Sequence, residues 1–477
     1  MLSRLKNISQ GHWPLFLMGS LSSLANLILP IVLVRILSPE DIGLYKTFFL
    51  YLMILPFIAL SGGPVNALYY WIGFDKHLRD DYIKNSWAVT IMFSSVLFVM
   101  GFFFLSFSFV FSLPLSTSQL IMLIICSFLS APSGFYGEVC VAKGETTKGA
   151  ILALSFELIK VAGFIFCAFK TRDITMIFYF YTLLMILSFI FMTSLASMNK
   201  VLTWRPDWEV MKRIMRYSVP ISISSGIIFV IDKLDLLILS GIISSESFAL
   251  YSLGCLIIPP LFLLEMSVQK IMIPRISALF VENNLEGIAL EFRKSVGDIG
   301  FLVVPAFFGL CFFSDAILAF LYTHAYSGAG IYLKVFAFSY LLLLIPHDAV
   351  LRATGKTDVI MKFNFLTLIL ACVILLFSAH HFSTLVTLML SVVVKFIPKL
   401  YGLTASRKII NSSLIDLIPW RQLGEYAVVS ALLTGICFSA KGYFPDEKLW
   451  LLSSIVLFAV TYLGLFGLVR KRHHFIS

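Results

Sequence analysis

The chain has 477 residues, of which 59% are hydrophobic and only 13% are charged, and its mean hydropathy is +0.94. Soluble domains carry roughly a quarter charged residues, so this composition excludes a soluble protein and indicates a chain that crosses a membrane many times. The formal net charge of +10 does not indicate nucleic-acid binding, because the Lys and Arg residues concentrate between the apolar runs.

Apolar runs of about 20 residues, each long enough for a membrane-spanning helix, recur along the whole chain. The first starts near Trp13 and lacks a small-residue cleavage site, so we expect an uncleaved span. Fourteen spans are predicted, near 13–34, 47–68, 86–109, 119–138, 150–169, 174–196, 218–240, 249–270, 297–314, 328–346, 359–379, 383–404, 425–440 and 449–469. The fold class predicted is therefore an all-α polytopic membrane protein.

Basic residues gather on one side of this predicted topology. With a cytoplasmic N-terminus, the great majority of Lys and Arg residues lie in cytoplasmic segments. The outer side carries Arg35, Lys46, Lys170, Arg172, Lys441 and Lys448. The positive-inside rule thus predicts that both termini are cytoplasmic. On the inner side, Trp204, Trp208 and the basic stretch ending at Arg216 are expected to lie in the membrane interface.

An internal repeat is visible in the sequence. Ile36 to Tyr45 aligns with Ile242 to Tyr251, 206 residues later, and half of the aligned positions are identical. Each copy follows the first span of a half, and an even number of spans separates the copies, which predicts two halves of the same orientation. The predicted domains are a six-helix lobe with an interfacial connector at 1–216, a second six-helix lobe at 217–405 and a two-helix extension at 406–477.

Several motifs of the chain match a known pattern. They are Arg35 to Tyr45, Gly62 to Ala67, Pro220 to Ser222, Asp232-Lys233 and Ser244 to Tyr251. In these motifs, and in order and length, the chain resembles bacterial polysaccharide flippases of the Wzx type, within the multidrug/oligosaccharidyl-lipid/polysaccharide exporter superfamily. The resemblance implies two lobes that enclose a central cavity and work by alternating access.

The chain departs from that family pattern in two places. The family commonly has an Asp-Arg pair where this chain has Asp232-Lys233. A basic residue often closes the second span of the family, where this chain has Tyr69-Tyr70. The lipid-phosphate contact associated with that second position is therefore not carried over.

Two of the four lysines deep inside predicted spans have acidic neighbours on the same helix. A cation at membrane depth costs several kcal/mol unless it is paired or hydrated. Glu157 and Lys160 are three residues apart and can pair on one face, so they either pack the bundle or line the cavity. Asp232 and Asp235 share a helix face from which Lys233 points away, so these three side chains cannot line one surface.

The other two lysines, Lys334 and Lys395, have no acidic residue within a helical turn. We expect Glu265 and the aspartates at 232 and 235 to be their nearest candidate partners. Both lysines are the stronger candidates for cavity cations, although Lys334 lies near a span end and snorkelling to the outer interface is the alternative. The outer mouth of the first hairpin carries Arg35, which nearby Glu40 and Asp41 can neutralise.

The leading functional hypothesis is a flippase for polyprenyl-(pyro)phosphate-linked oligosaccharide in the bacterial inner membrane. In this hypothesis, cations in a hydrated cavity of the flippase bind the phosphate of the substrate. The substrate-binding candidates are Lys334, Lys395, Lys233, Lys160 and Arg35. The alternative is a cation-coupled drug exporter of the same superfamily, and a glycan polymerase or ligase ranks third. The candidate groups for H⁺ or Na⁺ coupling are Asp232, Asp235, Glu265 and Glu157.

The sequence contains no motif that is typical of an enzyme or of a metal site. There is no nucleophile–base pair, phosphate-binding loop or zinc spacing, the adjacent pairs His380-His381 and His473-His474 do not share a helix face, and the seven cysteines are scattered singly. We therefore predict a non-enzyme without a metal or an organic cofactor. The predicted partners are a lipid-linked oligosaccharide, membrane lipids and other glycan-assembly proteins, with no nucleic acid.

Overall fold

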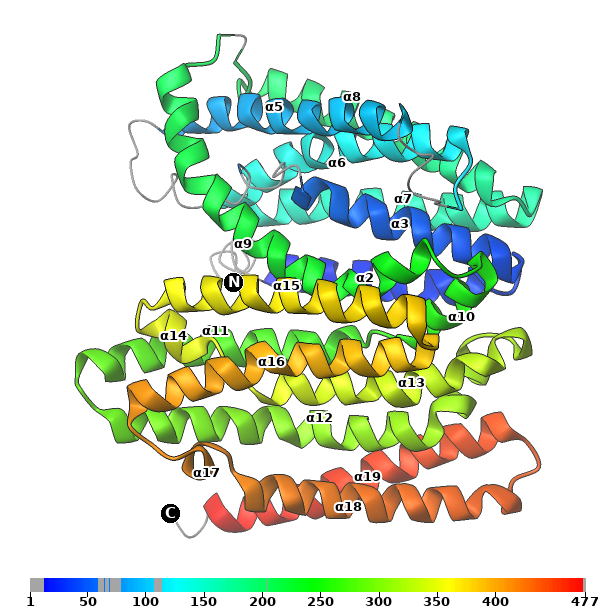
Figure 1. Cartoon of the computed structure of the whole chain (residues 1–477), viewed down its shortest axis with the longest axis vertical. Coiled ribbons are helices and arrows are strands. Elements are labelled where there is room, and N and C mark those ends of the chain that lie inside the picture. Colours follow the sequence, from blue (N-terminus) through cyan, green and yellow to red (C-terminus); the bar gives the residue numbers. More distant parts are fainter. Residues whose placement is uncertain are drawn as a thin grey trace, which may run out of the picture. The chain divides into compact units, whose positions relative to one another are not determined.

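A computed structural model of the chain describes residues 13–58, 64, 68, 79–106, 114–203 and 205–474. These residues form helices and turns, with no strand among them (Figure 1). Their contacts divide the chain into two compact units, Met1–Ala249 and Leu250–Ser477, and each unit is considered by itself.

The first unit is a bundle of long helices. Within it α6 packs against α5, α7 and α8, α2 packs against α7, and α9 packs against α3 and α5. Rings on α3, α7 and α8 form its aromatic core, in which Phe48 stacks on Phe178 with centroids 4.1 Å apart. Its helices are α2 (Trp13–Leu33), α3 (Pro39–Ile58), α5 (Arg79–Ser106), α6 (Thr117–Ala142), α7 (Thr146–Thr171), α8 (Ile174–Met198) and α9 (Trp208–Ser240), and α10 (Ser245–Gly254) continues from it into the second unit.

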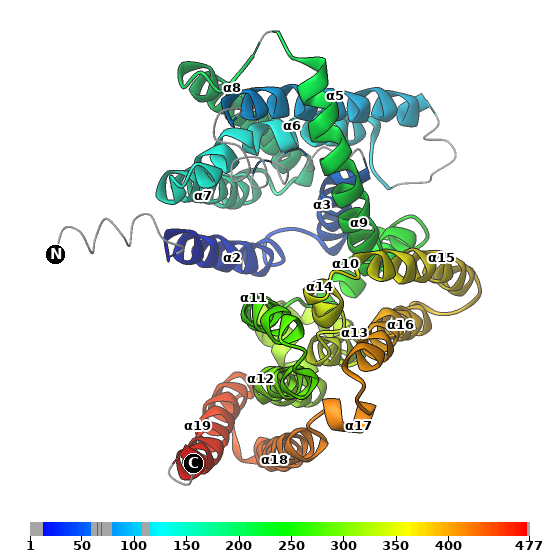
Figure 2. The same ribbon diagram turned by 90° about the vertical axis from the view of Figure 1, so that its left-hand side faces the viewer.

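The second unit is built around α12 (Leu285–Leu321), the longest helix described, with 37 residues. This helix contacts α11, α13 and α18, and α19 also packs against it (Figure 2). The remaining helices are α11 (Pro259–Val281), η1 (His324–Ala329), α13 (Gly330–Phe336), η2 (Ala337–Leu344), α14 (Ala349–Ala353), α15 (Thr357–His381), α16 (Thr384–Ile410), α17 (Leu414–Leu417), α18 (Trp420–Ser439), η3 (Ala440–Tyr443) and α19 (Glu447–His474).

The all-α polytopic fold predicted from the sequence is confirmed. Each of the fourteen predicted spans overlaps a helix or a pair of consecutive helices. Among the described residues, ten helical segments are long and apolar enough to cross a membrane, and the bent pair α10–α11 would make eleven. Two predicted spans are broken: residues 249–270 divide between α10 and α11 before Pro259-Pro260, and residues 328–346 continue from α13 into a 3₁₀ turn.

Some sequence predictions fall on residues outside the described part of the chain. These are the segment around Gly62-Gly63 and Asn66, the pair Tyr69-Tyr70, and Trp204. The basic stretch that follows Trp204 is described, and it forms the first turns of α9 rather than a separate element. Its depth in the membrane and the lobe boundaries at 216 and 405 stay predictions.

The start of α9 is fixed by one aspartate. The Asp207 carboxylate accepts hydrogen bonds from the backbone N–H groups of Glu209 and Val210, at 2.8 and 3.4 Å, which caps the helix. The backbone N–H of Asp207 donates to Asn85 Oδ1 on α5 at 2.7 Å. Asp207 therefore both caps α9 and joins its start to α5.

The repeat predicted from the sequence has the same hydrogen bonds in both copies. Ser38 Oγ accepts from the backbone N–H of Asp41 at 3.1 Å, and Ser244 Oγ accepts from that of Ser247 at 3.3 Å. Turn hydrogen bonds also recur 206 residues apart: Ile36 to Leu33 with Ile242 to Leu239, Leu37 to Leu33 with Ile243 to Leu239, and Ile42 to Ser38 with Phe248 to Ser244. The repeat is thus a repeated backbone structure as well as a repeated sequence.

A second repeated turn joins α6 to α7 and α14 to α15. Gly144 and Gly355 both have positive φ, at 88° and 75°, which glycine adopts without steric cost. The end of the helix before each glycine is closed by the same three backbone hydrogen bonds, 211 residues apart. The matching sequences, Ala142 to Thr146 and Ala353 to Thr357, share an Ala-x-Gly-x-Thr pattern that the sequence analysis missed.

Candidate functional site

The first unit holds a closed polar triad between α2 and α7. Lys160 Nζ lies 2.5 Å from Glu157 Oε2, as their spacing predicted. Asn26 on α2 joins both groups, because its amide nitrogen donates to Glu157 Oε2 at 2.8 Å and its amide oxygen accepts from Lys160 Nζ at 3.0 Å. The two charges are therefore neutralised and hydrogen-bonded within the protein.

Substituting Asn26 with leucine is expected to lower the free energy of unfolding by about 1–2 kcal/mol. The Lys160–Glu157 pair would lose hydrogen bonds to both charged groups while it stays half-buried. Chemical unfolding of the purified protein measures this change. A variant as stable as the wild type would show that the triad does not hold α2 against α7.

The other candidates of the first unit lie apart from this triad in the sequence and on other elements. Arg35 is exposed after the end of α2, and its guanidinium donates to the Ile31 carbonyl. On α9, Asp235 is buried with 2% exposure, Lys233 is half-buried and Asp232 is exposed. The three charged side chains of α9 thus do not line one surface, and Asp232 and Asp235, which the helical spacing placed on one face, differ in burial.

The partner of Lys334 differs from the prediction. Its Nζ lies 2.7 Å from Asp315 Oδ2 on α12, rather than beside Glu265 or the α9 aspartates. The side chains of Lys334 and Asp315 are 45% and 64% exposed. Gly330 makes room for Asp315, since a Cβ at Gly330 would come within 1.8 Å of Asp315 Oδ1. This ion pair is more exposed than the Lys160–Glu157 pair, whose side chains are 13% and 25% exposed.

A half-buried ion pair in the second unit involves Lys399, which was counted among the basic residues of the cytoplasmic segments and span ends. Lys399 Nζ on α16 lies 3.6 Å from Glu265 Oε1 on α11, and the two side chains are 15% and 14% exposed. Gln269 also donates to Glu265 Oε1, at 3.1 Å, and Lys399 donates to the Ile345 carbonyl at 3.3 Å. Lys395, one turn earlier on α16, is half-buried.

Replacing Glu265 with glutamine is expected to lower the free energy of unfolding by about 2 kcal/mol. The buried Lys399 would lose its countercharge, a loss of several kcal/mol in a dry interior that partial exposure reduces. Thermal unfolding of the purified protein measures the effect. The double variant Glu265→Gln/Lys399→Met removes the uncompensated charge and should recover part of the loss in free energy of unfolding. A double variant that loses more free energy of unfolding than the two single variants together would contradict this explanation.

Next to this pair lies a polar cluster at the turn before α14. Arg352 Nη2 lies 2.6 Å from Asp348 Oδ2, and the imidazole Nδ1 of His347 lies 3.9 Å from Asp348 Oδ1. The cluster is packed tightly, because a Cβ at Gly402 would come within 2.7 Å of the His347 carbonyl oxygen. His347 and Asp348 were not predicted as site residues, although an acid beside an imidazole within an apolar run was a visible signal in the sequence.

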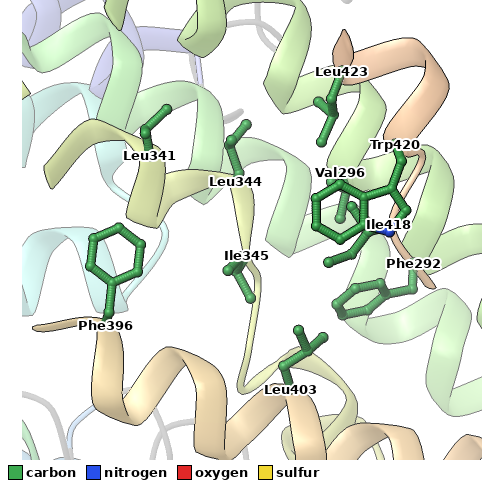
Figure 3. A pocket seen from close by; sticks show the side chains of 10 residues that line it. All are labelled: Phe292, Val296, Leu341, Leu344, Ile345, Phe396, Leu403, Ile418, Trp420 and Leu423. Atoms are coloured by element: carbon green, nitrogen blue, oxygen red, sulfur yellow. The ribbon is translucent and has the colours of Figure 1, made fainter. Parts of the chain in front are cut away.

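An apolar pocket lies in the second unit, between α12, η2, α16 and the start of α18 (Figure 3). Its volume is about 170 Å³. It is lined by Phe292, Val296, Leu341, Leu344, Ile345, Phe396, Leu403, Ile418, Trp420 and Leu423. Ile345 links the pocket to the polar region, since its side chain lines the pocket and its carbonyl accepts from Lys399.

Metal binding gains no support from the arrangement. Within the described ranges, no three His, Cys, Asp or Glu side chains come together in a way that could hold a metal ion. The chemistry of the candidate lysines is ionic: a carboxylate holds Lys334 in an exposed pair, and carboxylates hold Lys160 and Lys399 in half-buried pairs. Such groups bind anions by exchanging one anionic partner for another.

Comparison with solved structures shows which proteins share this fold. The chain superposes on the structure of the lipid II flippase MurJ with a TM-score of 0.72 and 14% sequence identity, covering 96% of this chain and 99% of that one. An inward-facing multidrug resistance transporter of the MATE family gives a TM-score of 0.55 at 15% identity, covering 82% and 96%. The MATE transporter VcmN of Vibrio cholerae gives 0.54 at 14% identity, covering 86% and 98%. At these identities the likeness concerns the fold.

Sequence comparison is more specific. No curated protein sequence matches the chain. Residues 32–330, well over half of the chain, match the model of a family described as polysaccharide biosynthesis protein. This match includes both copies of the repeat and the Glu157–Lys160 pair of α7, whereas Asn26, which joins that pair, lies before the matched range. The chain belongs to this family of polysaccharide biosynthesis proteins, and it has the multi-pass membrane fold found in solved lipid-flippase and multidrug-transporter structures.

Proposed function

We propose that this protein is a flippase that moves polyprenyl-(pyro)phosphate-linked oligosaccharide repeat units from the inner to the outer leaflet of the bacterial inner membrane. The family match supports a role in polysaccharide biosynthesis, and the fold is one found in a lipid II flippase. O-antigen is the glycan class that we propose, by analogy with the Wzx-type pattern. Alternating access would present one site to each side of the membrane in turn.

The observation that carries this proposal is the open ion pair of Lys334 and Asp315. Both side chains are about half exposed although they belong to helices of a membrane protein. A lysine held by one carboxylate at an accessible position can exchange that carboxylate for a substrate phosphate. Lys395, Lys233 and Arg35 are proposed as further cations along the path, and Lys160 as the least available, because its triad is closed.

The alternative function is the export of drugs coupled to H⁺ or Na⁺. The fold shared with multidrug transporters supports it. In that function Asp232 and Asp235 would bind the coupling ion. Glu157 would first have to leave Lys160 and Asn26, and Glu265 would have to leave Lys399 and Gln269. The same acids are candidates for coupling in a flippase.

Deletion of the gene tests the proposed function in cells. A flippase predicts that lipid-linked repeat units accumulate on the inner leaflet and that the exported glycan disappears. Accumulation of single units on the outer leaflet would instead indicate a polymerase or a ligase. Unchanged glycan with increased drug sensitivity would support the drug exporter and contradict our proposal.

A further inference from the structure

The apolar pocket of the second unit is large enough for part of a hydrocarbon chain. Its volume of about 170 Å³ exceeds an engineered cavity of roughly 150 Å³ that binds benzene. All ten lining side chains are apolar or aromatic, and one of them, Trp420, remains 57% exposed at the edge (Figure 3). The pocket therefore offers a hydrocarbon an apolar surface that is reached from outside.

Basic residues border the pocket at one end. On α16, Arg407 follows Leu403 by four residues, so the two lie about 40° apart around the helix, and Arg407 is exposed. On α18, Arg421 directly follows Trp420, and its side chain is 92% exposed. Its guanidinium donates to Glu425 from Nε at 3.2 Å, which leaves the terminal N–H groups for another acceptor.

The distance from the far end of the pocket to the neighbouring basic residue corresponds to about one leaflet. The helix rise of 1.5 Å per residue separates Phe396 from Arg407 by about 16 Å along α16, roughly half of a 30 Å hydrocarbon core. A tryptophan beside an arginine is typical of headgroup depth. The distribution of loop charges predicts that this end of the second unit faces the cytoplasm, where anionic lipids and basic residues attract each other.

We propose that this pocket binds an anionic phospholipid of the inner leaflet, with one acyl chain against Leu344, Phe396 and Leu403 and its phosphate between Arg407 and Arg421. Charge complementarity selects the anionic headgroup, because a zwitterionic lipid gains less from two guanidinium groups. The exposed Ile415 on α17, at 73%, would lie in the same interface. This inference does not depend on the proposed transport function.

Binding to the purified full-length protein in phosphatidylcholine nanodiscs tests the proposal. Phosphatidylglycerol should be retained at one molecule per chain in native mass spectrometry, with at least tenfold preference over phosphatidylcholine. Arg407→Gln/Arg421→Gln should abolish the preference, and Leu344→Trp, which fills the pocket, should lower retention at least fivefold. Leu341→Phe repeats the filling test if the tryptophan variant does not fold.

Two matched controls separate this site from general lipid contact. Leu463→Trp adds the same bulk to the exposed face of α19, and Lys362→Gln removes an exposed charge from α15. Both should leave phosphatidylglycerol retention unchanged. Equal retention of the two lipids by the wild type, or an equal loss in the controls, would overturn the proposal. Displacement of phosphatidylglycerol by equimolar polyprenyl phosphate would assign the pocket to the substrate tail and also overturn it.

Discussion

Replacing Gly43 with alanine is expected to lower the free energy of unfolding by about 3 kcal/mol or more. Gly43 lies on α3, in the first copy of the repeat, and Ser245 begins α10 in the second copy. A Cβ at Gly43 would lie 1.8 Å from the Ser245 carbonyl oxygen, so the backbone itself would have to move. The contact between the two copies therefore requires glycine at this position.

Gly19 supplies the matched control. It lies on the exposed surface of α2, and a Cβ there meets nothing within 4 Å. Gly19→Ala should be neutral or stabilising by up to about 1 kcal/mol, because alanine favours helix. Chemical unfolding of both variants measures the difference. Equal stability of the two variants would show that the repeat copies do not pack as closely as the structure has them.

The second large effect is expected in transport. Lys334→Met should reduce export of the lipid-linked glycan about tenfold to a hundredfold, because a charged hydrogen bond to phosphate contributes about 1.5–3 kcal/mol. Lys334→Arg keeps the charge and should retain most of the activity. The measurement is the amount of exported glycan in a deletion strain that carries each variant at equal protein level.

Lys441 gives a control for the loss of an accessible ion pair. Lys441 and Glu447 lie 2.7 Å apart and are 50% and 44% exposed, close to the values of the Lys334–Asp315 pair. This pair joins η3 to α19 in the C-terminal extension, away from the predicted lobes in the sequence. Lys441→Met should leave export within twofold of the wild type. An equal loss in both methionine variants would show that Lys334 acts through stability.

The fold could be predicted from the sequence, but the partners of the charged residues inside the predicted spans could not all be predicted. Helix periodicity predicted the Glu157–Lys160 pair, because its geometry is contained in one helix. The Lys334–Asp315 pair joins two helices, and the predicted span 297–314 ended one residue before the aspartate. Pairing between helices depends on how they pack, which apolar periodicity does not specify.

Span boundaries explain the missed lysine of the second unit. Lys399 follows Pro398 near the predicted end of its span, so it was grouped with the cytoplasmic charges. In the structure α16 continues to Ile410, which moves Lys399 into the helix interior beside Glu265. The second repeated turn was missed for another reason, since its copies are 211 rather than 206 residues apart and one fixed offset does not align both motifs.

Transbilayer movement in reconstituted vesicles tests the flippase proposal most directly. The purified protein would be placed in liposomes that contain a polyprenyl-pyrophosphate-linked oligosaccharide, and a glycan-cleaving enzyme added outside would report the accessible fraction. The proposal predicts that cleavage rises from about half of the lipid to nearly all of it with the wild type, and more slowly with Lys334→Met. Cleavage that stays at half with a folded wild-type protein, under an imposed H⁺ or Na⁺ gradient as well as without one, would contradict it.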